Sequence, residues 1–260
     1  MRNKRIIFLL TVIISESLLV CFHYQNLPGK EMAPEDNRQT VVHKNTGNQV
    51  RFPDKNLESA VRIRIGKPEG QICQSDVAGL KTINLSKSDI KSIGGLENFT
   101  SLEELHLDRN NVRNITPLGT LINLKVLCLH ENSISMIKAL GELVNLEALF
   151  LDHNQITDLT PLTGLTKLKC LWICENNIRD LTPLNGLKEL VTLHLSDNKI
   201  NDIQALSGLT KIKDLGLENN QITNVEPLKN MTALIEVVIS GNPVEDLSPV
   251  KGLPNIMRIE

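Results

Sequence analysis

Apolar residues recur at fixed intervals through most of this chain. In the unit that begins at Leu168, the recurring positions hold leucine or isoleucine, with one asparagine. They are Leu168, Leu171, Ile173, Asn176, Ile178, Leu181, Leu184 and Leu187. The same skeleton begins every 22 residues, at Leu80, Leu102, Leu124, Leu146, Leu168, Leu190, Ile212, Leu234 and Ile256. Eight units are complete, and the ninth contains only the first residues of the pattern. This period predicts a solenoid, in which each unit is one structural repeat and neighbouring repeats share a continuous core.

The order of places within a unit, Leu-x-x-Leu-x-Leu-x-x-Asn-x-Leu, is typical of leucine-rich repeats. It predicts an α/β solenoid: a leucine-rich repeat horseshoe with a parallel β-sheet on its concave face and 3₁₀-like segments on its convex face. Each unit should contribute a short strand, around 170–174 in the reference unit, then a turn at Asn176 and a compact return. In several units a proline opens the return, where its fixed φ and missing N–H suit a helical start. These prolines are Pro117, Pro161, Pro183, Pro227 and Pro249.

One polar place is asparagine in nearly every unit: Asn110, Asn132, Asn154, Asn176, Asn198, Asn220 and Asn242. A buried side-chain amide has donors and an acceptor that can satisfy backbone groups in the turns above and below it. We therefore interpret these asparagines as part of the fold rather than as a binding site. Ser88 takes the same place in the first unit.

The chain before the repeats divides into three parts. Residues 1–21 have a positive start, an apolar run at 6–14 and a small-x-small cleavage site at 15–17, which together predict a signal peptide. The apolar run is shorter than the about 20 residues that a membrane span needs. Two alternatives stay open, namely an uncleaved membrane anchor and a lipoprotein signal that uses Cys21. Residues 22–50 are polar and aperiodic, which predicts a flexible linker.

Residues 51–79 predict a helical N-terminal cap, followed by the repeats at 80–260. Asp54 is placed to cap a helix that Gly66 and Pro68 would end. A second, short helix would begin at Ser75-Asp76. Four apolar residues share one face of the first helix: Leu57, Ala60, Val61 and Ile65. An end repeat would otherwise expose its apolar core, so a solenoid needs such a cap.

These features together resemble the internalin-type leucine-rich repeats of Gram-positive bacteria, over about residues 51–260. The resemblance rests on the Asp-x-x-Leu-x-x-Ala-Val helix, the Gly-Lys-Pro turn, the Ser-Asp-Val helix and 22-residue repeats that carry Thr-Pro-Leu. It implies a surface-exposed or secreted protein that binds a partner protein on its concave face. Two features depart from the family pattern. No immunoglobulin-like domain or cell-wall sorting motif follows the repeats, and the ninth repeat is expected to lack a C-terminal cap.

Because side chains alternate along a strand, the concave surface can be read from the sequence. Places three, five and seven of each unit should point outward, and places four and six into the core. The centre of this surface is predicted to be apolar and exposed, with Trp172 and Phe150 beside Cys128 and Cys170. Its polar surround includes Glu104, His106, His130, Asp152 and His194. An aromatic centre with a polar rim is typical of a protein-binding patch, so we predict these residues as the partner-binding site.

Composition and charge narrow the chemistry. A formal net charge of −2 and a pI of about 6.3 give no basic surface for nucleic acid. The five cysteines show no metal-finger or redox spacing, and we predict no cofactor. His130, Asp152 and Cys174 share one column, but no second shell for a metal is evident. A Cys128–His106 or Cys174–His153 nucleophile pair would lack a cleft and an oxyanion turn, so we do not expect an enzyme.

The sequence therefore favours an exported, non-enzymatic scaffold, secreted or at the cell surface, that binds a protein through its concave sheet. By the resemblance alone, a host cell-surface receptor is one candidate partner. The alternative is a structural, envelope-associated protein that self-associates through its uncapped C-terminal end, since an exposed strand edge is a pairing template. The histidine-rich rim also suggests binding that changes between about pH 5 and 8.

Overall fold

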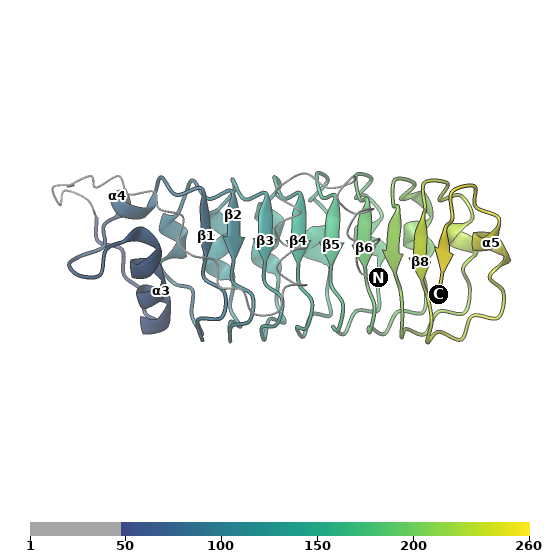
Figure 1. Cartoon of the computed structure of the whole chain (residues 1–260), viewed down its shortest axis with the longest axis horizontal. Helices are drawn as coiled ribbons and strands as arrows, with labels where there is room; N and C mark the ends of the chain where they lie inside the picture. Colours follow the sequence, from purple (N-terminus) through teal and green to yellow (C-terminus); the bar gives the residue numbers. More distant parts are fainter. Residues whose placement is uncertain (1–47) are drawn as a thin grey trace, which may run out of the picture. The chain divides into compact units, whose positions relative to one another are not determined.

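The structure is a computed structural model that describes residues 48–260. This part of the chain forms one sheet of nine parallel strands in sequence order, β1 to β9 (Figure 1). Neighbouring strands pair residues 22 positions apart, as in Leu127 with Leu149 and Leu149 with Leu171. The predicted leucine-rich repeat fold is thereby confirmed. The predicted signal peptide, and residues 22–47 of the predicted linker, lie outside the described residues.

The strands are shorter than expected. They are β1 (Thr82–Asn84), β2 (Glu104–His106), β3 (Val126–Cys128), β4 (Ala148–Phe150), β5 (Cys170–Trp172), β6 (Thr192–His194), β7 (Asp214–Gly216), β8 (Glu236–Val238) and β9 (Arg258–Ile259). Hydrogen bonding between repeats continues beyond them, because Ile173 N donates to His194 O and Glu175 N to Ser196 O, each at 2.9 Å. Side chains at place seven therefore keep the alternation that the strand begins.

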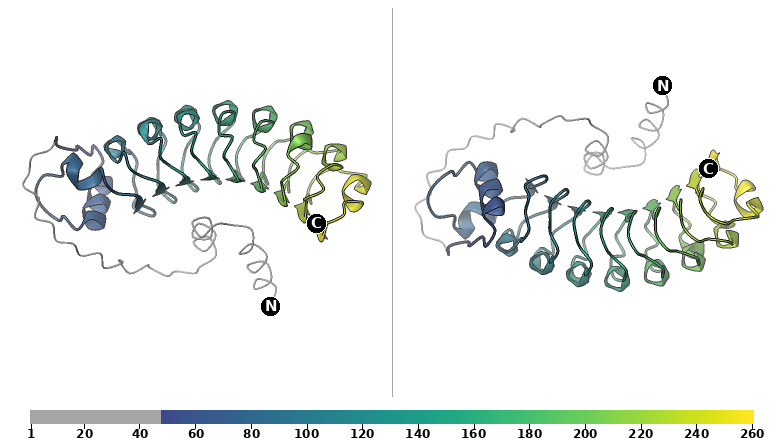
Figure 2. Two further views of the ribbon diagram at one scale, coloured as in Figure 1. Left: turned by 90° about the horizontal axis from the view of Figure 1, so that it is seen from above. Right: turned by 90° about the horizontal axis from the view of Figure 1, so that it is seen from below.

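Seen along the strands, residues 48–260 curve, with the sheet on the concave side and short helical returns on the convex side (Figure 2). The returns are η1 (Leu96–Asn98), η2 (Thr116–Thr120), η3 (Lys138–Glu142), η4 (Thr160–Leu162), η5 (Thr182–Leu184), η6 (Gln204–Gly208), η7 (Glu226–Leu228) and α5 (Ser248–Lys251). All are 3₁₀ helices except α5. The five prolines noted above lie at the first or second place of their returns, as predicted.

Each repeat turns sharply after its strand through a residue with positive φ. That residue directly precedes the repeat asparagine, as Glu175 (φ 51°) precedes Asn176. The set is Lys87, Arg109, Glu131, His153, Glu175, Asp197, Asn219 and Gly241. Glycine suits this conformation best, yet only the eighth repeat has it. The position therefore carried no sequence signal in the other repeats.

The asparagines join neighbouring turns, and all are buried except Asn132 and Asn242, which are partly buried. Asn176 Nδ2 donates to Leu151 O and Cys174 O, each at 3.0 Å, and its Oδ1 accepts from Ile156 N at 2.9 Å. Leu151 and Ile156 belong to the preceding repeat. The amide thus satisfies its own turn and the turn on one side, whereas contacts on both sides were expected. The structural role predicted for these residues is confirmed.

A helical cap precedes the first repeat. Helix α3 (Lys55–Ile65) begins after Asp54, whose carboxylate accepts from Asn56 N and Leu57 N, and ends at Gly66 with φ 65°. Helix α4 (Gln74–Val77) follows. Val50, assigned from the sequence to the end of the linker, is only 4% exposed, and its N–H donates to Ile72 O. The folded part therefore includes residues before the expected boundary at 51.

Candidate functional site

The strands bring the predicted apolar centre together on the concave side. Cys128, Phe150, Trp172 and His194 are register partners on β3 to β6. The Phe150 and Trp172 rings meet edge to face, with centroids 5.7 Å apart. The Trp172 and His194 rings are stacked, with centroids 4.7 Å apart and planes 4° apart. Parallel pairing at one spacing produces this row, since residues at the same place in successive repeats must be neighbours.

The prediction that the fold leaves this centre exposed is wrong for most of its residues. Phe150 is 3% exposed, and Cys128 and Cys170 are similarly buried, while Trp172 is partly exposed. Same-face neighbours about 4.8 Å apart shield one another, which contributes to this burial. These side chains nevertheless lie outside the continuous leucine core. They form a separate apolar cluster on the other side of the sheet.

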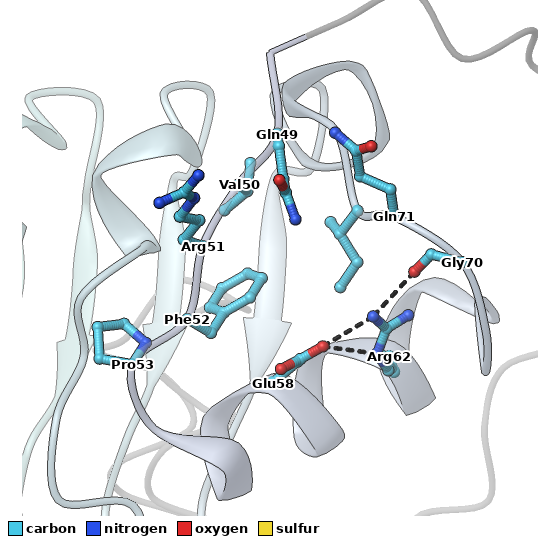
Figure 3. Close-up of a pocket in the computed structure, with 10 residues that line it drawn as sticks. Gln49, Val50, Arg51, Phe52, Pro53, Glu58, Arg62, Gly70 and Gln71 are labelled. Carbon is cyan, nitrogen blue, oxygen red and sulfur yellow. Dashed lines mark hydrogen bonds and ion pairs between the residues drawn. The ribbon is translucent and has the colours of Figure 1, made fainter.

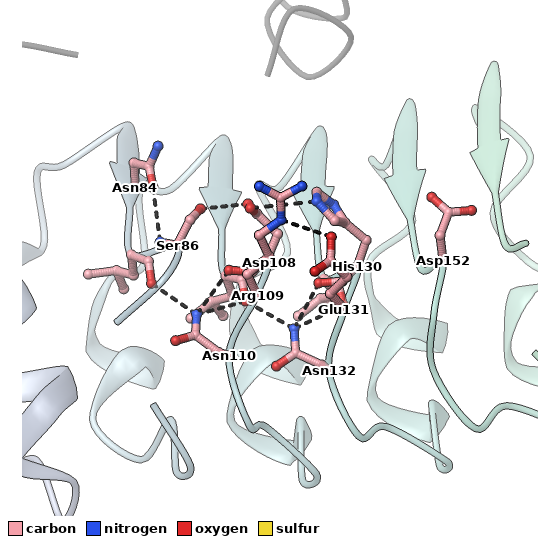
Figure 4. A network of polar contacts seen from close by, with 12 residues as sticks. Asn84, Ser86, Asp108, Arg109, Asn110, His130, Glu131, Asn132 and Asp152 are labelled. Atoms are coloured by element: carbon pink, nitrogen blue, oxygen red, sulfur yellow. Dashed lines mark hydrogen bonds and ion pairs between the residues drawn. The ribbon is translucent and has the colours of Figure 1, made fainter. Parts of the chain in front are cut away.

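Acidic residues lie beside each concave histidine. His106 Nε2 is 2.7 Å from Glu104 Oε1, and His194 Nε2 is 3.1 Å from Asp214 Oδ2. His130 Nε2 is 3.6 Å from Asp108 Oδ2, and the other oxygen of Asp108 accepts from Ser86 Oγ (Figure 4). Each predicted histidine of the rim therefore has its own carboxylate.

These surroundings change the titration of the two central histidines in opposite directions. Burial lowers the pKa of His130 and outweighs the attraction of Asp108 and Asp152. At His194 burial acts the same way, but the hydrogen bond and charge of Asp214 prevail and raise its pKa. Burial also raises the pKa of Asp152. At neutral pH His130 is therefore neutral, while the charge of His194 depends on Asp214.

The column of His130, Asp152 and Cys174 is arranged for hydrogen bonding. Asp152 Oδ1 accepts from Cys174 N at 2.7 Å. Burial, with the nearby Asp152 charge, raises the pKa of the Cys174 thiol, which keeps it protonated and a poor nucleophile or metal ligand. Across residues 48–260, no group of three histidine, cysteine or acidic side chains has the geometry to hold a metal ion.

A pocket of about 640 Å³ lies at the cap, away from the predicted site (Figure 3). Phe52 and Ile72 are among its lining residues, and Arg62 borders it. The Arg62 guanidinium donates to Glu58 Oε1 at 2.7 Å and to Gly70 O at 2.9 Å. These contacts tie α3 to the loop after it, so the polar lining of this pocket serves the cap itself.

Sequence reasoning missed a ladder of charges along one flank of the sheet. At place two, Glu103 pairs with Lys81 at 2.8 Å and Lys125 at 2.6 Å, and Glu147 pairs with Lys169 at 2.6 Å. The ion pairs with Lys125 and with Lys81 lower the pKa of Glu103 to about 2. Alternating signs at a spacing of 22 residues were the signal that could have found it. The concave positions, by contrast, carry no such alternation.

Comparison with known proteins identifies the family. The model for "Leucine Rich repeats (2 copies)" matches residues 79–120, 122–164, 144–186, 166–208 and 188–230. The crystal structure of internalin C2 from Listeria monocytogenes is 32% identical, with a TM-score of 0.76, and the match covers 80% of this chain and 93% of that one. This chain is an internalin-like leucine-rich repeat protein. Internalin F of the same species is 31% identical, with a TM-score of 0.68, over 80% of this internalin-like chain and 69% of that one.

A more distant match shows the fold alone. The ectodomain of the plant receptor kinase GASSHO1/SCHENGEN3 from Arabidopsis thaliana, in complex with CASPARIAN STRIP INTEGRITY FACTOR 2, is 22% identical. It aligns with a TM-score of 0.64 over 71% of this internalin-like chain and 24% of that one. Comparison with curated proteins gives no match. Within residues 48–260, no helix has the length and apolar character to cross a membrane. Leucine-rich repeats commonly serve as surfaces for protein binding.

Proposed function

We propose that this internalin-like protein is an exported, non-enzymatic scaffold, secreted or held at the cell surface, whose concave sheet recognises a partner protein. The observation that carries the proposal is the aromatic row of Phe150, Trp172 and His194 on the side of the sheet opposite the leucine core. The fold does not need large aromatic side chains there, because the core is complete without them. Aromatic residues are over-represented among the anchors of protein interfaces.

The proposed partner-binding residues are those predicted from the sequence. Trp172 and Phe150 form the centre with Cys128 and Cys170, and the carboxylate–histidine pairs surround them. The similarity to internalins supports a partner that is a surface protein of a host cell or of a neighbouring cell. Export itself depends on residues 1–21 and is tested separately, by looking for the chain in the medium and envelope of the cells that make it.

The decisive test is a binding screen of the purified chain against mammalian cells and bacterial envelopes. We expect saturable binding to cells that Trp172→Ala weakens by about 2 kcal/mol or more, as for an interface anchor. Met136→Ala is the matched control, because Met136 is a large apolar side chain, 78% exposed, outside the concave strands. Undiminished binding by Trp172→Ala would refute the patch. Binding to envelopes alone, or a concentration-dependent oligomer, would favour a structural role at the cell's own surface.

A further inference from the structure

In the eight complete repeats, charge on the concave face has one sign, although Arg258 on β9 pairs with Glu236 at the C-terminal end of the face. Apart from histidines and the thiols of three cysteines, the ionisable side chains at places three, five and seven of the eight complete repeats are carboxylates: Glu104, Asp108, Asp152, Asp214, Glu218 and Glu236. No lysine or arginine occupies these places in the repeats between residues 80 and 255. A face of one sign favours a partner of the opposite sign, both in encounter and in register.

Within residues 48–260, two hydrogen-bond acceptors on this face have no donor. Asp152 is 6% exposed, and its Oδ2 has no hydrogen-bond partner within residues 48–260, although its Oδ1 accepts from Cys174 N. His130 is 7% exposed, and its Nδ1 is likewise unsatisfied in this part of the chain. Asp108 beside Nε2 favours the tautomer with its proton on Nε2, which leaves Nδ1 as an acceptor.

The residues that carry these two acceptors are neighbours in adjacent repeats. His130 and Asp152 occupy place seven of successive repeats, and Glu131 N donates to Asp152 O at 2.9 Å, so the backbone pairing continues to this point (Figure 4). A buried acceptor without a donor is unfavourable, and most such groups in folded proteins are paired. A single group with several donors would satisfy both.

An apolar path leads to this pair. Phe150 precedes Asp152 by two residues and faces the same side of the sheet, with Trp172 beside it on β5. A ligand group with a long apolar stem and a charged head rich in donors would match both parts. Arginine has this form: its guanidinium carries five donors and no acceptor, and its stem packs on apolar surfaces.

We propose that the concave face binds an arginine side chain of its partner, with the guanidinium on Asp152 and His130 and the stem against Phe150. This inference rests on the proposed function, because it names the chemistry of the partner at the same surface. Lysine fits less well, since its compact ammonium does not present donors in the fixed planar fork that two neighbouring acceptors require.

The test uses the intrinsic fluorescence of the full chain, whose single tryptophan, Trp172, neighbours the proposed contact. The probe is the acetylated and amidated peptide Gly-Arg-Gly-Arg-Gly. The reference peptide has citrulline in place of arginine, which is similar in shape but uncharged. We expect a saturable signal with the arginine peptide and binding of the citrulline peptide that is weaker by about tenfold or more.

Two variants with the same change in charge localise the contact. Asp152→Asn should weaken the arginine peptide by about tenfold or more. Asp180→Asn should not, because Asp180 lies before η5, where its Oδ1 accepts from Thr182 N and where Asn114 and Asn224 do the same in other repeats. If Asp152→Asn alters thermal unfolding, His130→Phe is used in its place. Phenylalanine is similar in size to histidine but lacks the Nδ1 acceptor, so this variant should also bind the arginine peptide more weakly.

Three outcomes would overturn the arginine contact: no binding of the arginine peptide, equal binding of both peptides, or equal effects of Asp152→Asn and Asp180→Asn. The proposed function would fail differently. Cell binding that depends on Trp172 but survives Asp152→Asn refutes the arginine contact and leaves the concave-face scaffold standing. Cell binding that is indifferent to Trp172→Ala refutes the patch as a whole.

Discussion

Asn176 shows how much of the solenoid depends on single side chains. Its amide holds the carbonyls of Leu151 and Cys174 and the N–H of Ile156, which the turn would otherwise leave without partners. The residue is 7% exposed, so water cannot replace these bonds. The preceding residue, Glu175, has a positive φ and lies in the same turn.

Asn176→Ala should therefore destabilise the protein by about 3 kcal/mol, because it leaves several buried backbone groups unsatisfied. The measurement is the free energy of unfolding from urea titration. Asn177→Ala is the control, since the neighbouring side chain is partly exposed and makes its side-chain hydrogen bond to Lys199 Nζ at 2.7 Å. It should change the free energy of unfolding by less than about 0.5 kcal/mol. Equal losses in the two variants would contradict the role given to the buried amide.

Among the elements, α3 is joined to the first repeat by several side chains, of which Asp54 makes two of the contacts. Asp54 Oδ1 caps the helix, while Oδ2 accepts from Lys91 N at 2.7 Å and Ser92 N at 3.0 Å. Burial opposes ionisation of Asp54, but these four backbone donors prevail and lower its pKa. The same residue thus caps the start of the helix and fixes the cap on the repeats.

Asp54→Ala should cost about 2 kcal/mol of folding free energy, the upper part of the range for an N-cap, because contacts to two elements are lost. Asp54→Asn keeps an acceptor for the N-terminus of the helix, so this variant should lose clearly less folding free energy. Thermal unfolding followed by circular dichroism compares the two variants. If the alanine variant matched the asparagine variant, the second oxygen would have no part in holding the cap.

The charge ladder just before β1, β2 and β3 makes stability depend on pH. Lys125 and Lys81 lower the pKa of Glu103 in the folded state to about 2, below the about 4.3 of a free glutamate. A lowered folded pKa stabilises the protein above the unfolded pKa, and this contribution is lost as the pH falls from about 4 to 2. Wild type should lose more stability over this window than Glu103→Gln, in urea unfolding at each pH. Because the Glu103 side chain is partly exposed, 0.5 M salt should shrink the difference, and a difference that salt leaves unchanged would contradict the ion-pair origin.

At the scale of the molecule, the repeats from Leu80 onward contact mainly their neighbours through the same register. Helix α3 lies in the cap before the first repeat, whereas the concave aromatic row spans the repeats of β4, β5 and β6. Such an array gains and loses stability repeat by repeat.

Deleting residues 168–189, one whole repeat, should therefore leave a folded protein in which β4 pairs with β6. The urea m-value should fall by roughly a tenth, in proportion to the surface no longer exposed on unfolding. A deletion of 21 residues, 168–188, is the control. It shifts the register by one residue and turns core side chains outward, so it should unfold the protein. Unfolding of the 22-residue deletion would show that the repeats are not interchangeable.

How far prediction reached differs between the fold and the site. The constant period of the repeats determined the parallel register, the concave and convex sides and the asparagine ladder, and the capping residues Asp54 and Gly66 determined the cap helix. Only the tertiary structure decided the accessibility of the concave residues, because burial of Phe150 depends on what surrounds it and not on its place in the repeat. It also decided which carboxylate each histidine meets, and that Asp152 Oδ2 and His130 Nδ1 find no donor in the part of the chain that the structure describes. The repeat period determines toward which side of the sheet each side chain points. Distances between side-chain atoms depend instead on rotamers and on neighbouring residues, which the period does not specify.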